Sequence, residues 1–243
     1  MRPTITIIIP AFNEEGHLGI TVQETIKTIE PLVDDYEILI IDDGSSDQTG
    51  PMADEFSRQN PKIRAVHNEQ NRGLGFSCAR GIQLATKDYI GWVPADTVWE
   101  PGALKEVIGL LGSADIVTTY LLSLKERTWF RRFISRSFTV CLNVLFRLNL
   151  KYYNGGCFHR RELLQSLSLK SKGFTIWAEA LVRLSVQGYR CREVGAYFKE
   201  RTVGQSTALS WRSVKQTLSV IGILIRDIYF RKETRRPKGE QDG

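Results

Sequence analysis

Two neighbouring carboxylates, Asp42 and Asp43, stand where an apolar run ends and a turn begins. The run is Ile38-Leu39-Ile40-Ile41, and the turn is Gly44-Ser45-Ser46-Asp47. An aliphatic, β-branched run bounded by turn formers indicates a strand that is buried on both faces. Acids at the carboxyl end of such a strand lie where open α/β sheets bind their ligands. The pair could accept hydrogen bonds from a base or a sugar, or help to hold a cation.

The same pattern occurs at two more places along the chain. Residues 5–9 run into the loop Pro10-Ala11-Phe12-Asn13-Glu14, and a strand expected at residues 89–93 ends close to Asp96. Because the carboxyl ends of parallel strands meet at one edge of a sheet, we expect these loops to build one ligand site. An acid such as Asp96 is well placed there to bind a divalent cation on a diphosphate, although a single Asp can also cap its own loop.

Strands and helices alternate through the first half of the chain. We expect strands at residues 5–9, 37–41, 63–67, 89–93 and 116–119. We expect helices at residues 15–29, 49–59, 75–85 and 102–111. This order predicts the α/β class, with a mostly parallel sheet that is flanked by helices on both faces.

The second half is more basic and contains two amphipathic helices. Residues 129–150 include four arginines and no acid, and their spacing predicts a helix with a polar and an apolar stripe. The expected polar stripe is Arg132, Arg136, Thr139, Asn143 and Arg147. The expected apolar stripe is Phe130, Phe133, Phe138, Leu142, Leu145 and Leu148. A second amphipathic helix is expected to carry Val214, Leu218, Ile221, Ile225 and Ile228 on one face. Between the two helices we expect a helix at residues 175–187 and a strand at residues 191–197.

The composition is that of an ordinary globular protein with one large domain. Among 243 residues, 42% are hydrophobic and 25% are charged, and the formal net charge is +6. A mildly basic chain suits nucleic acid, an anionic membrane or a phosphorylated substrate. The cysteines at positions 78, 141, 157 and 191 have no CxxC spacing, so we expect reduced thiols in the cytoplasm. We expect no signal peptide, and the aliphatic run at 220–225 is too short to span a bilayer.

Several motifs, taken in order, resemble the GT-A glycosyltransferases of family 2. They are the Pro10–Glu14 loop, Asp42-Asp43-Gly44-Ser45-Ser46-Asp47, and Asn71-Arg72-Gly73-Leu74-Gly75 with Ala79-Arg80-Gly81. Later segments are similar to the polyprenyl-phosphate branch of that family, typified by dolichyl-phosphate mannosyltransferases. Those segments are residues 132–136, 154–162 and 201–206. The resemblance implies a GT-A fold and sugar transfer from a nucleotide sugar.

The resemblance assigns the donor side of the site to the first two loops. By analogy with the family, Pro10, Phe12, Glu14 and Asp43 hold the base and the ribose, and Phe12 replaces the more usual tyrosine. Core packing is the alternative for Phe12, and a hydrogen bond within its own turn is the alternative for Asp43. Asp42 is expected to support the turn, because adjacent strand residues point in opposite directions.

The resemblance also implies a metal ligand. The family motif is commonly Asp-Ala-Asp, whereas this chain has Pro94-Ala95-Asp96 followed by Thr97 and Val98. Asp96 is therefore the expected catalytic ligand of Mg²⁺ or Mn²⁺, at a site where the diphosphate supplies most other ligands.

On the acceptor side, the resemblance points to residues from the second half. Arg201 is expected to be catalytic and to bind the acceptor phosphate, with Ser206 and Arg132 nearby, since a guanidinium can bind phosphate bidentately. An exposed arginine in a polar loop is the alternative for Arg201. A hydroxyl acceptor would need a base, for which Glu179 is the candidate; an ion pair with a nearby arginine is its alternative.

These assignments together imply an inverting transferase that moves a hexose from GDP-mannose or a UDP-sugar to polyprenyl or dolichyl phosphate. Residues 1–207 would form the transferase domain, with 129–150 as an inserted helix. Residues 208–230 would form a helix that associates with a membrane or mediates dimerisation, and 231–243 a charged, disordered tail. We expect a cytoplasmic protein bound peripherally to the inner face of a membrane, as a homodimer or with a small membrane partner.

Two alternatives stay open from the sequence. One is transfer to a sugar or lipid hydroxyl, and the other is a degenerate nucleotide-sugar-binding protein, which Pro94 and Val98 motivate. Nucleic-acid binding is not expected, because the basic residues lie beside aliphatic helices and match no nucleic-acid module.

Overall fold

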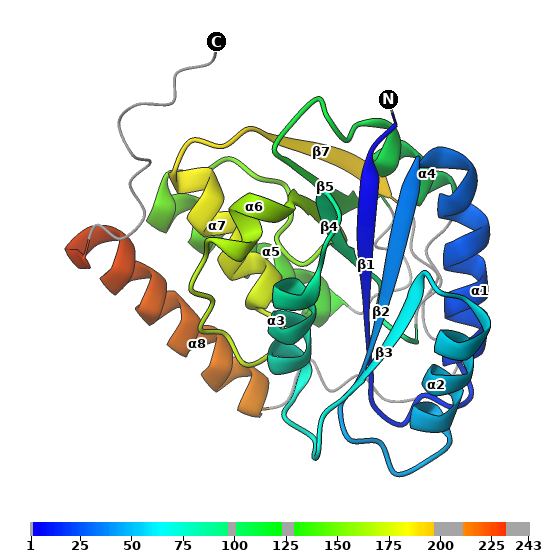
Figure 1. Cartoon of the computed structure of the whole chain (residues 1–243). Helices are drawn as coiled ribbons and strands as arrows, with labels where there is room; N and C mark the ends of the chain where they lie inside the picture. Colours follow the sequence, from blue (N-terminus) through cyan, green and yellow to red (C-terminus); the bar gives the residue numbers. More distant parts are fainter. Residues whose placement is uncertain (1, 97–100, 123–128, 197–210, 232–243) are drawn as a thin grey trace.

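The computed structural model describes residues 2–96, 101–122, 129–196 and 211–231. Within these ranges, seven strands form one sheet in the order β3-β2-β1-β4-β6-β5-β7, and helices cover both of its faces (Figure 1). The strands are β1 (Thr4–Ala11), β2 (Asp35–Asp42), β3 (Ile63–His67), β4 (Tyr89–Trp92), β5 (Ile116–Leu121), β6 (Cys157–Arg160) and β7 (Cys191–Ala196). Strand β6 is antiparallel to both of its neighbours, and the other strand pairs are parallel.

Helices alternate with the strands along most of the chain. They are α1 (Leu18–Ile29), η1 (Glu30–Leu32), α2 (Thr49–Gln59), α3 (Leu74–Leu84), α4 (Pro101–Gly109), α5 (Trp129–Phe146), α6 (Arg161–Gln165), α7 (Ile176–Val186), α8 (Trp211–Ile225) and the π-helical segment η3 (Arg226–Arg231). The α/β class and the mostly parallel sheet that the sequence predicts are confirmed.

The central strands are apolar on both sides because helices pack against both faces of the sheet. Ile7 and Ile40 contribute to the core shared with α1 and α4, whereas Ile8, Leu39 and Ile41 contribute to the core shared with α3 and α7. All five side chains are fully buried. This arrangement leaves the carboxyl ends of β1, β2 and β4 as a common edge from which loops emerge.

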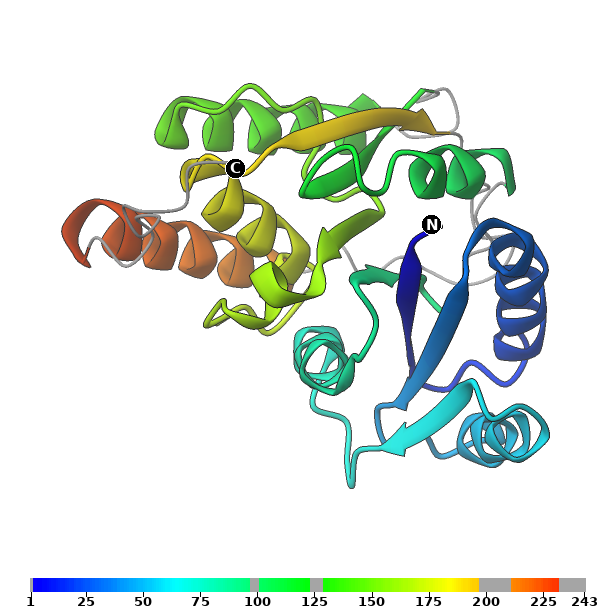
Figure 2. The same cartoon turned by 45° about the horizontal axis from the view of Figure 1, so that its top comes forward.

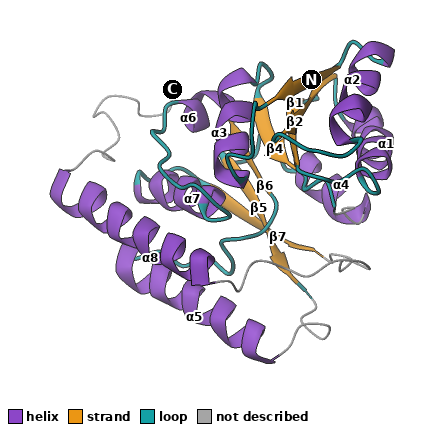
Figure 3. Ribbon diagram, turned by 90° about the horizontal axis from the view of Figure 1, so that it is seen from below, coloured by secondary structure: helices purple, strands orange, loops and turns teal. Residues whose placement is uncertain are grey.

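A third core holds the second half of the chain together. It contains Leu142 and Phe146 of α5, Leu181 of α7, and Val220 and Leu224 of α8. Figure 2 shows α8 next to α7 and far from α1 and α2, and Figure 3 shows α5 and α8 side by side. One face of α8 is thus buried against α5 and α7. None of the described helices has the length and apolarity that a membrane span requires.

Several expected elements, boundaries and side-chain positions in the second half are wrong. Strand β6 and helix α6 were not expected at all. Helix α5 ends at Phe146, because Arg147 adopts a positive φ of 55° and Asn143 bonds the backbone of Leu150 instead of facing solvent. Thr139, also expected on the polar stripe, is buried. On α8, Leu218 was expected with the apolar face but is 64% exposed.

Candidate active site

The loops after β1, β2 and β4 meet at the carboxyl edge of the sheet. The backbone nitrogen of Asp43 donates to the carbonyl of Ala11 at 2.8 Å, and that of Val93 donates to the carbonyl of Ile8 at 2.9 Å. Asp96 follows three residues after Val93 and is half-buried. The structure therefore places Asp43 and Asp96 on the loops that follow β2 and β4, the two strands that flank β1 in the sheet.

The two loops assigned to the donor are tied together by hydrogen bonds. Asn13 adopts a left-handed conformation with φ of 53°. Its side-chain oxygen accepts a hydrogen bond from the Ser46 nitrogen at 2.9 Å, and its backbone nitrogen donates one to Ser45 Oγ at 3.0 Å. The nitrogen of Glu14 donates to Thr49 Oγ1 at 2.7 Å. A ligand that binds these loops would meet a prearranged surface.

The aromatic side chain in this region is available to a ligand. Phe12 is 43% exposed, so the alternative of core packing is wrong. Pro10 is buried within β1, and Glu14 is half-buried with its carboxylate 3.1 Å from His17 Nδ1. An exposed ring beside polar loops can stack on a base.

Asp43 holds the turn that precedes α3. Its buried carboxylate accepts hydrogen bonds from Asn68 Nδ2 at 2.6 Å, the Arg72 nitrogen at 3.0 Å and the Gly73 nitrogen at 2.7 Å. Gly73 has φ of 89°, a left-handed conformation that favours glycine. A carboxylate offers about four acceptor positions, so these bonds leave room for about one further donor. Contact between Asp43 and a nucleotide stays a prediction.

Asn68 is a partner of Asp43 in the candidate site that the sequence pattern did not reveal. Arg80 donates to its side-chain oxygen at 2.6 Å, which directs the amide nitrogen toward Asp43 and toward Ser77 Oγ. Asn68 directly follows β3, and this place after a parallel strand was the signal that could have identified it.

Asp42 supports the neighbouring turn and an unexpected histidine. One carboxylate oxygen accepts from the Ser45 nitrogen at 3.0 Å, and the other lies 2.9 Å from His67 Nδ1. The second ring nitrogen of His67 lies 3.1 Å from Asp54. The hydrogen bond with Asp42, aided by Asp54 and opposed by partial burial, raises the pKa of His67. These contacts fit the expectation that Asp42 is a support for the turn.

Asp96 sits on an anchored turn. The preceding residue, Ala95, is buried, and its carbonyl accepts a hydrogen bond from Thr21 at 2.8 Å. Across the described ranges, no three His, Cys, Asp or Glu side chains gather into a group that could hold a metal ion. A cation at Asp96 could take further ligands from a diphosphate, as Mg²⁺ commonly does. The neighbouring positions Thr97 and Val98 lie outside the described residues.

Glu179 is engaged in the way that the ion-pair alternative predicts. It is fully buried in α7, and it accepts hydrogen bonds from Arg183 Nε at 2.9 Å and from the Ser171 nitrogen at 2.8 Å. A base must reach the hydroxyl that it deprotonates. These contacts favour a structural role for Glu179 over the role of base.

The remaining acceptor residues are less defined. Arg201 and Ser206 lie outside the described residues, so their roles stay predictions. Arg132 is exposed on α5.

Near the sheet, His159 is fully buried and stacks on Trp177 with ring centroids 6.0 Å apart, and burial lowers the pKa of His159 to about 3. His159 is therefore neutral at physiological pH.

A mostly parallel sheet with acids and an exposed aromatic ring at its carboxyl edge is typical of α/β proteins that bind a ligand at this edge. The family model described as "Glycosyl transferase family 2" matches residues 6–167. The chain belongs to glycosyltransferase family 2, and it is a glycosyltransferase with a GT-A-like fold.

Individual relatives agree with this assignment. Undecaprenyl-phosphate mannosyltransferase from Micrococcus luteus is 26% identical over 213 residues, which cover 83% of this chain and 86% of that protein. Glycosyltransferase AglD from Haloferax volcanii is 26% identical over 113 residues, which cover 46% of this chain and 18% of AglD.

The fold is also that of solved transferases. Glucosyl-3-phosphoglycerate synthase from Mycobacterium tuberculosis, in complex with Mn²⁺, UDP and glucosyl-3-phosphoglycerate, superimposes with a TM-score of 0.66. It is 22% identical, and the match covers 90% of this chain and 80% of that chain. A structure of the same synthase with Mg²⁺ and UDP gives a TM-score of 0.65.

Proposed function

We propose that this chain transfers a hexose, with inversion, from GDP-mannose or a UDP-sugar to a polyprenyl phosphate. The observation that carries the proposal is the relative named Undecaprenyl-phosphate mannosyltransferase, whose match extends over 83% of this chain and 86% of that protein. The similarity therefore includes the second half, where the acceptor residues are expected. The lack of an accessible base at Glu179 also favours a phosphate over a hydroxyl acceptor.

The chemistry requires little proton transfer. A phosphate monoester has a second pKa of about 6, so its oxygen is already a nucleophile at neutral pH. That oxygen attacks the anomeric carbon, the bond from this carbon to the nucleoside diphosphate breaks, and the diphosphate leaves with the bonding electrons. A single in-line displacement inverts the anomeric carbon. The protein would act by positioning the reactants and by stabilising the departing diphosphate.

The donor would bind at the carboxyl edge of β1, β2 and β4. The free acceptor position on Asp43 suits a ring N–H of uracil or guanine, and Phe12 would stack on the base. Asp96 would hold Mg²⁺ or Mn²⁺, which would neutralise charge on the diphosphate. Solved transferases of the same fold contain these metals with UDP, which supports this part of the proposal.

The acceptor would be presented by a membrane surface that docks on α5. The outward side of this helix exposes Trp129 by 73%, Phe133 by 64% and Val144 by 74%, while Arg132 and Arg136 are also exposed. Aromatic and aliphatic side chains next to arginines are typical of helices that lie in a bilayer interface. The arginines would repel a second copy of the same face but attract anionic lipids.

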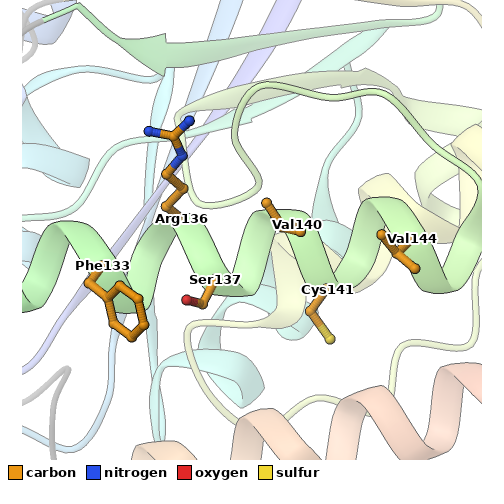
Figure 4. Close-up of a pocket in the computed structure, with 6 residues that line it drawn as sticks. All are labelled: Phe133, Arg136, Ser137, Val140, Cys141 and Val144. Carbon is orange, nitrogen blue, oxygen red and sulfur yellow. The ribbon is translucent and has the colours of Figure 1, made fainter.

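The surface of α5 also contains a shallow apolar hollow. Its volume is about 470 Å³, and it is lined by Phe133, Arg136, Ser137, Val140, Cys141 and Val144. In Figure 4, the Arg136 guanidinium points away from Phe133, Ser137 and Cys141. This separation of charge and apolar surface would let acyl chains contact the hollow while the guanidinium meets headgroup phosphates. We accordingly propose a location on the cytoplasmic face of a membrane.

Calorimetric titration with a panel of GDP- and UDP-sugars, followed by turnover assays with polyprenyl phosphate, tests the proposal. Binding and transfer to the lipid phosphate are expected. Transfer only to hydroxyl acceptors would contradict the phosphate acceptor, and binding without turnover would favour a degenerate binding protein. Flotation with anionic and neutral liposomes tests the docking surface. The double variant Phe133→Ser with Val144→Ser should bind liposomes more weakly than the wild type. Both side chains are exposed, so the substitutions should leave the buried core unchanged.

A further inference from the structure

A continuous set of contacts joins the C-terminal helical segment to the donor half of the site. The contacts pass through residues 170–173, which we call the bridging segment. At one end, Lys170 Nζ donates to Asp227 of η3 at 2.7 Å. At the other end, the Lys172 carbonyl accepts a hydrogen bond from Gly75 in the first turn of α3. This helix directly follows the turn whose backbone amides bind Asp43.

Buried acids hold the bridging segment at its first two residues. The backbone nitrogens of Lys170 and Ser171 donate to Glu179 at 3.0 and 2.8 Å, and both Glu179 and Asp227 are fully buried. Arg183 joins the two acids, because it donates to Glu179 at 2.9 Å and to Asp227 at 2.9 Å. Buried charges of this kind are stable only while they are paired, so loss of one partner disturbs the group.

The charge state of Asp227 matches this arrangement. Burial disfavours its ionised form, but hydrogen bonds led by that from Lys170 outweigh burial and keep its pKa below the usual range. Asp227 is therefore ionised at neutral pH and can hold the Lys170 ammonium in place.

The bridging segment packs directly on the backbone of α3. The nitrogen of Gly75 donates to the carbonyl oxygen of Lys172 at 3.3 Å. A Cβ atom at Gly75 would come within 2.4 Å of the Lys172 carbonyl carbon, so only glycine fits this contact. Gly73, two residues earlier, donates its nitrogen to Asp43 at 2.7 Å. A shift of the bridging segment would therefore move the turn that fixes Asp43.

Helix α8 contacts the far end of the same segment. A Cβ atom at Gly173 would lie 2.5 Å from the side-chain oxygen of Gln216 in α8. The segment is thus held between α3 on one side and the C-terminal helices on the other, at Gln216 and at Asp227.

We propose that Lys170 and Asp227 are positioning residues for donor binding, and that α8 with η3 forms a structural part of the donor site. Neither residue contacts the donor. Their ion pair fixes the bridging segment, and the segment fixes the amides of residues 72 and 73 on Asp43. The inference rests on the proposed function, because it assumes that a nucleotide binds at Asp43.

The test uses Lys170→Met, Asp227→Asn and Lys170→Arg in the full chain. Calorimetry with the nucleoside diphosphate that binds the wild type should show a Kd raised about 3- to 30-fold for the first two variants, the range of couplings through residues without ligand contact. Lys170→Arg, which keeps the positive charge, should have the Kd of the wild type. The KM for the acceptor should stay unchanged. Lys62→Met, which removes an exposed ion pair with Asp35, is the matched control and should leave the Kd unchanged.

A purely structural role predicts a different result. In that case Lys170→Met and Asp227→Asn would lower the Tm but leave the Kd of the folded protein at the wild-type value, which would overturn the inference. If Asp227→Asn does not fold, Lys170→Met with its Lys170→Arg rescue decides the question. Nucleotide binding without lipid turnover would contradict the proposed acceptor alone, whereas a wild type that binds no nucleotide would overturn both proposals.

Discussion

Asp43→Asn separates the role of this acid in the fold from its role in donor binding. The Asn side chain can still accept bonds at one oxygen, from Asn68 and the Arg72 nitrogen. Its amide group would then face the Gly73 nitrogen, so a donor would replace the acceptor at 2.7 Å. Hydrogen bonds to charged groups contribute about 1.5–3 kcal/mol each. We therefore expect the free energy of unfolding to fall by about 1.5–3 kcal/mol.

The assay is urea unfolding, monitored by tryptophan fluorescence, together with calorimetric titration of UDP and GDP. Loss of the proposed base contact should raise the Kd of the folded variant by about tenfold, equivalent to about 1.4 kcal/mol. Glu55→Gln, on the exposed side of α2, is the control and should change neither quantity. A change in unfolding free energy below about 0.5 kcal/mol would refute the reasoning that the Gly73 bond to Asp43 holds the turn.

Four further changes test other parts of the structure. Asp96→Ala should reduce turnover by orders of magnitude without loss of the fold, as judged by circular dichroism, and wild-type activity would remove Asp96 from the site. Arg201→Ala should reduce turnover similarly, with its main effect on steps that depend on the acceptor. The raised pKa of His67 means that its ion pairs stabilise the protein below about pH 6.5 and lose this effect as the pH rises through the raised pKa. The wild type should therefore be more stable than His67→Gln at pH 6, by less than about 1 kcal/mol because the ring is partly exposed. Urea titrations should show this difference shrinking between pH 6 and pH 9. Gly75→Ala should destabilise the protein by about 1–3 kcal/mol, because the new methyl group would meet backbone atoms, whereas Gly102→Ala has open space and should be neutral or stabilising.

The sequence predicts regular elements best where local signals coincide. Helix α2 and strand β3 begin and end at the expected residues, because apolar spacing and flanking turn residues agree there. Strand β6 has only four residues, and its place depends on a distant pairing. The ring of Phe158 occupies the space that a side chain on Gly91 would need, with 2.3 Å to the hypothetical Cβ atom. A pattern read along the chain does not contain such a contact.

The candidate site likewise has parts that the sequence predicts and parts that depend on distant contacts. The loops after β1, β2 and β4 could be predicted because strand ends with acids share one edge of the sheet. The partners of Asp43 could not, because Asn68, Arg72 and Gly73 are 25–30 positions away in the sequence. Periodicity also misplaced Asn143, since its side chain bonds the backbone beyond the end of α5.

The helix pair α5 and α8 links the membrane proposal to the donor proposal. Helix α5 exposes the proposed lipid-docking surface, while α8 packs in the same core and contacts the bridging segment. In η3, the Tyr229 ring stacks on Phe146 of α5 with centroids 6.3 Å apart, and its hydroxyl donates to the Leu145 carbonyl. The surface proposed to meet the lipid and the segment proposed to hold the donor turn thus belong to one packed unit.

The most direct test of the central claim is the product formed from a nucleotide hexose and polyprenyl phosphate by the purified protein with Mg²⁺ or Mn²⁺. The product should be analysed by mass spectrometry for its linkage and by NMR for its anomeric configuration. We predict a polyprenyl-linked hexosyl phosphate whose anomeric centre is inverted relative to the donor. A retained configuration, or a hexose that is transferred only to hydroxyl acceptors, would contradict the proposed function.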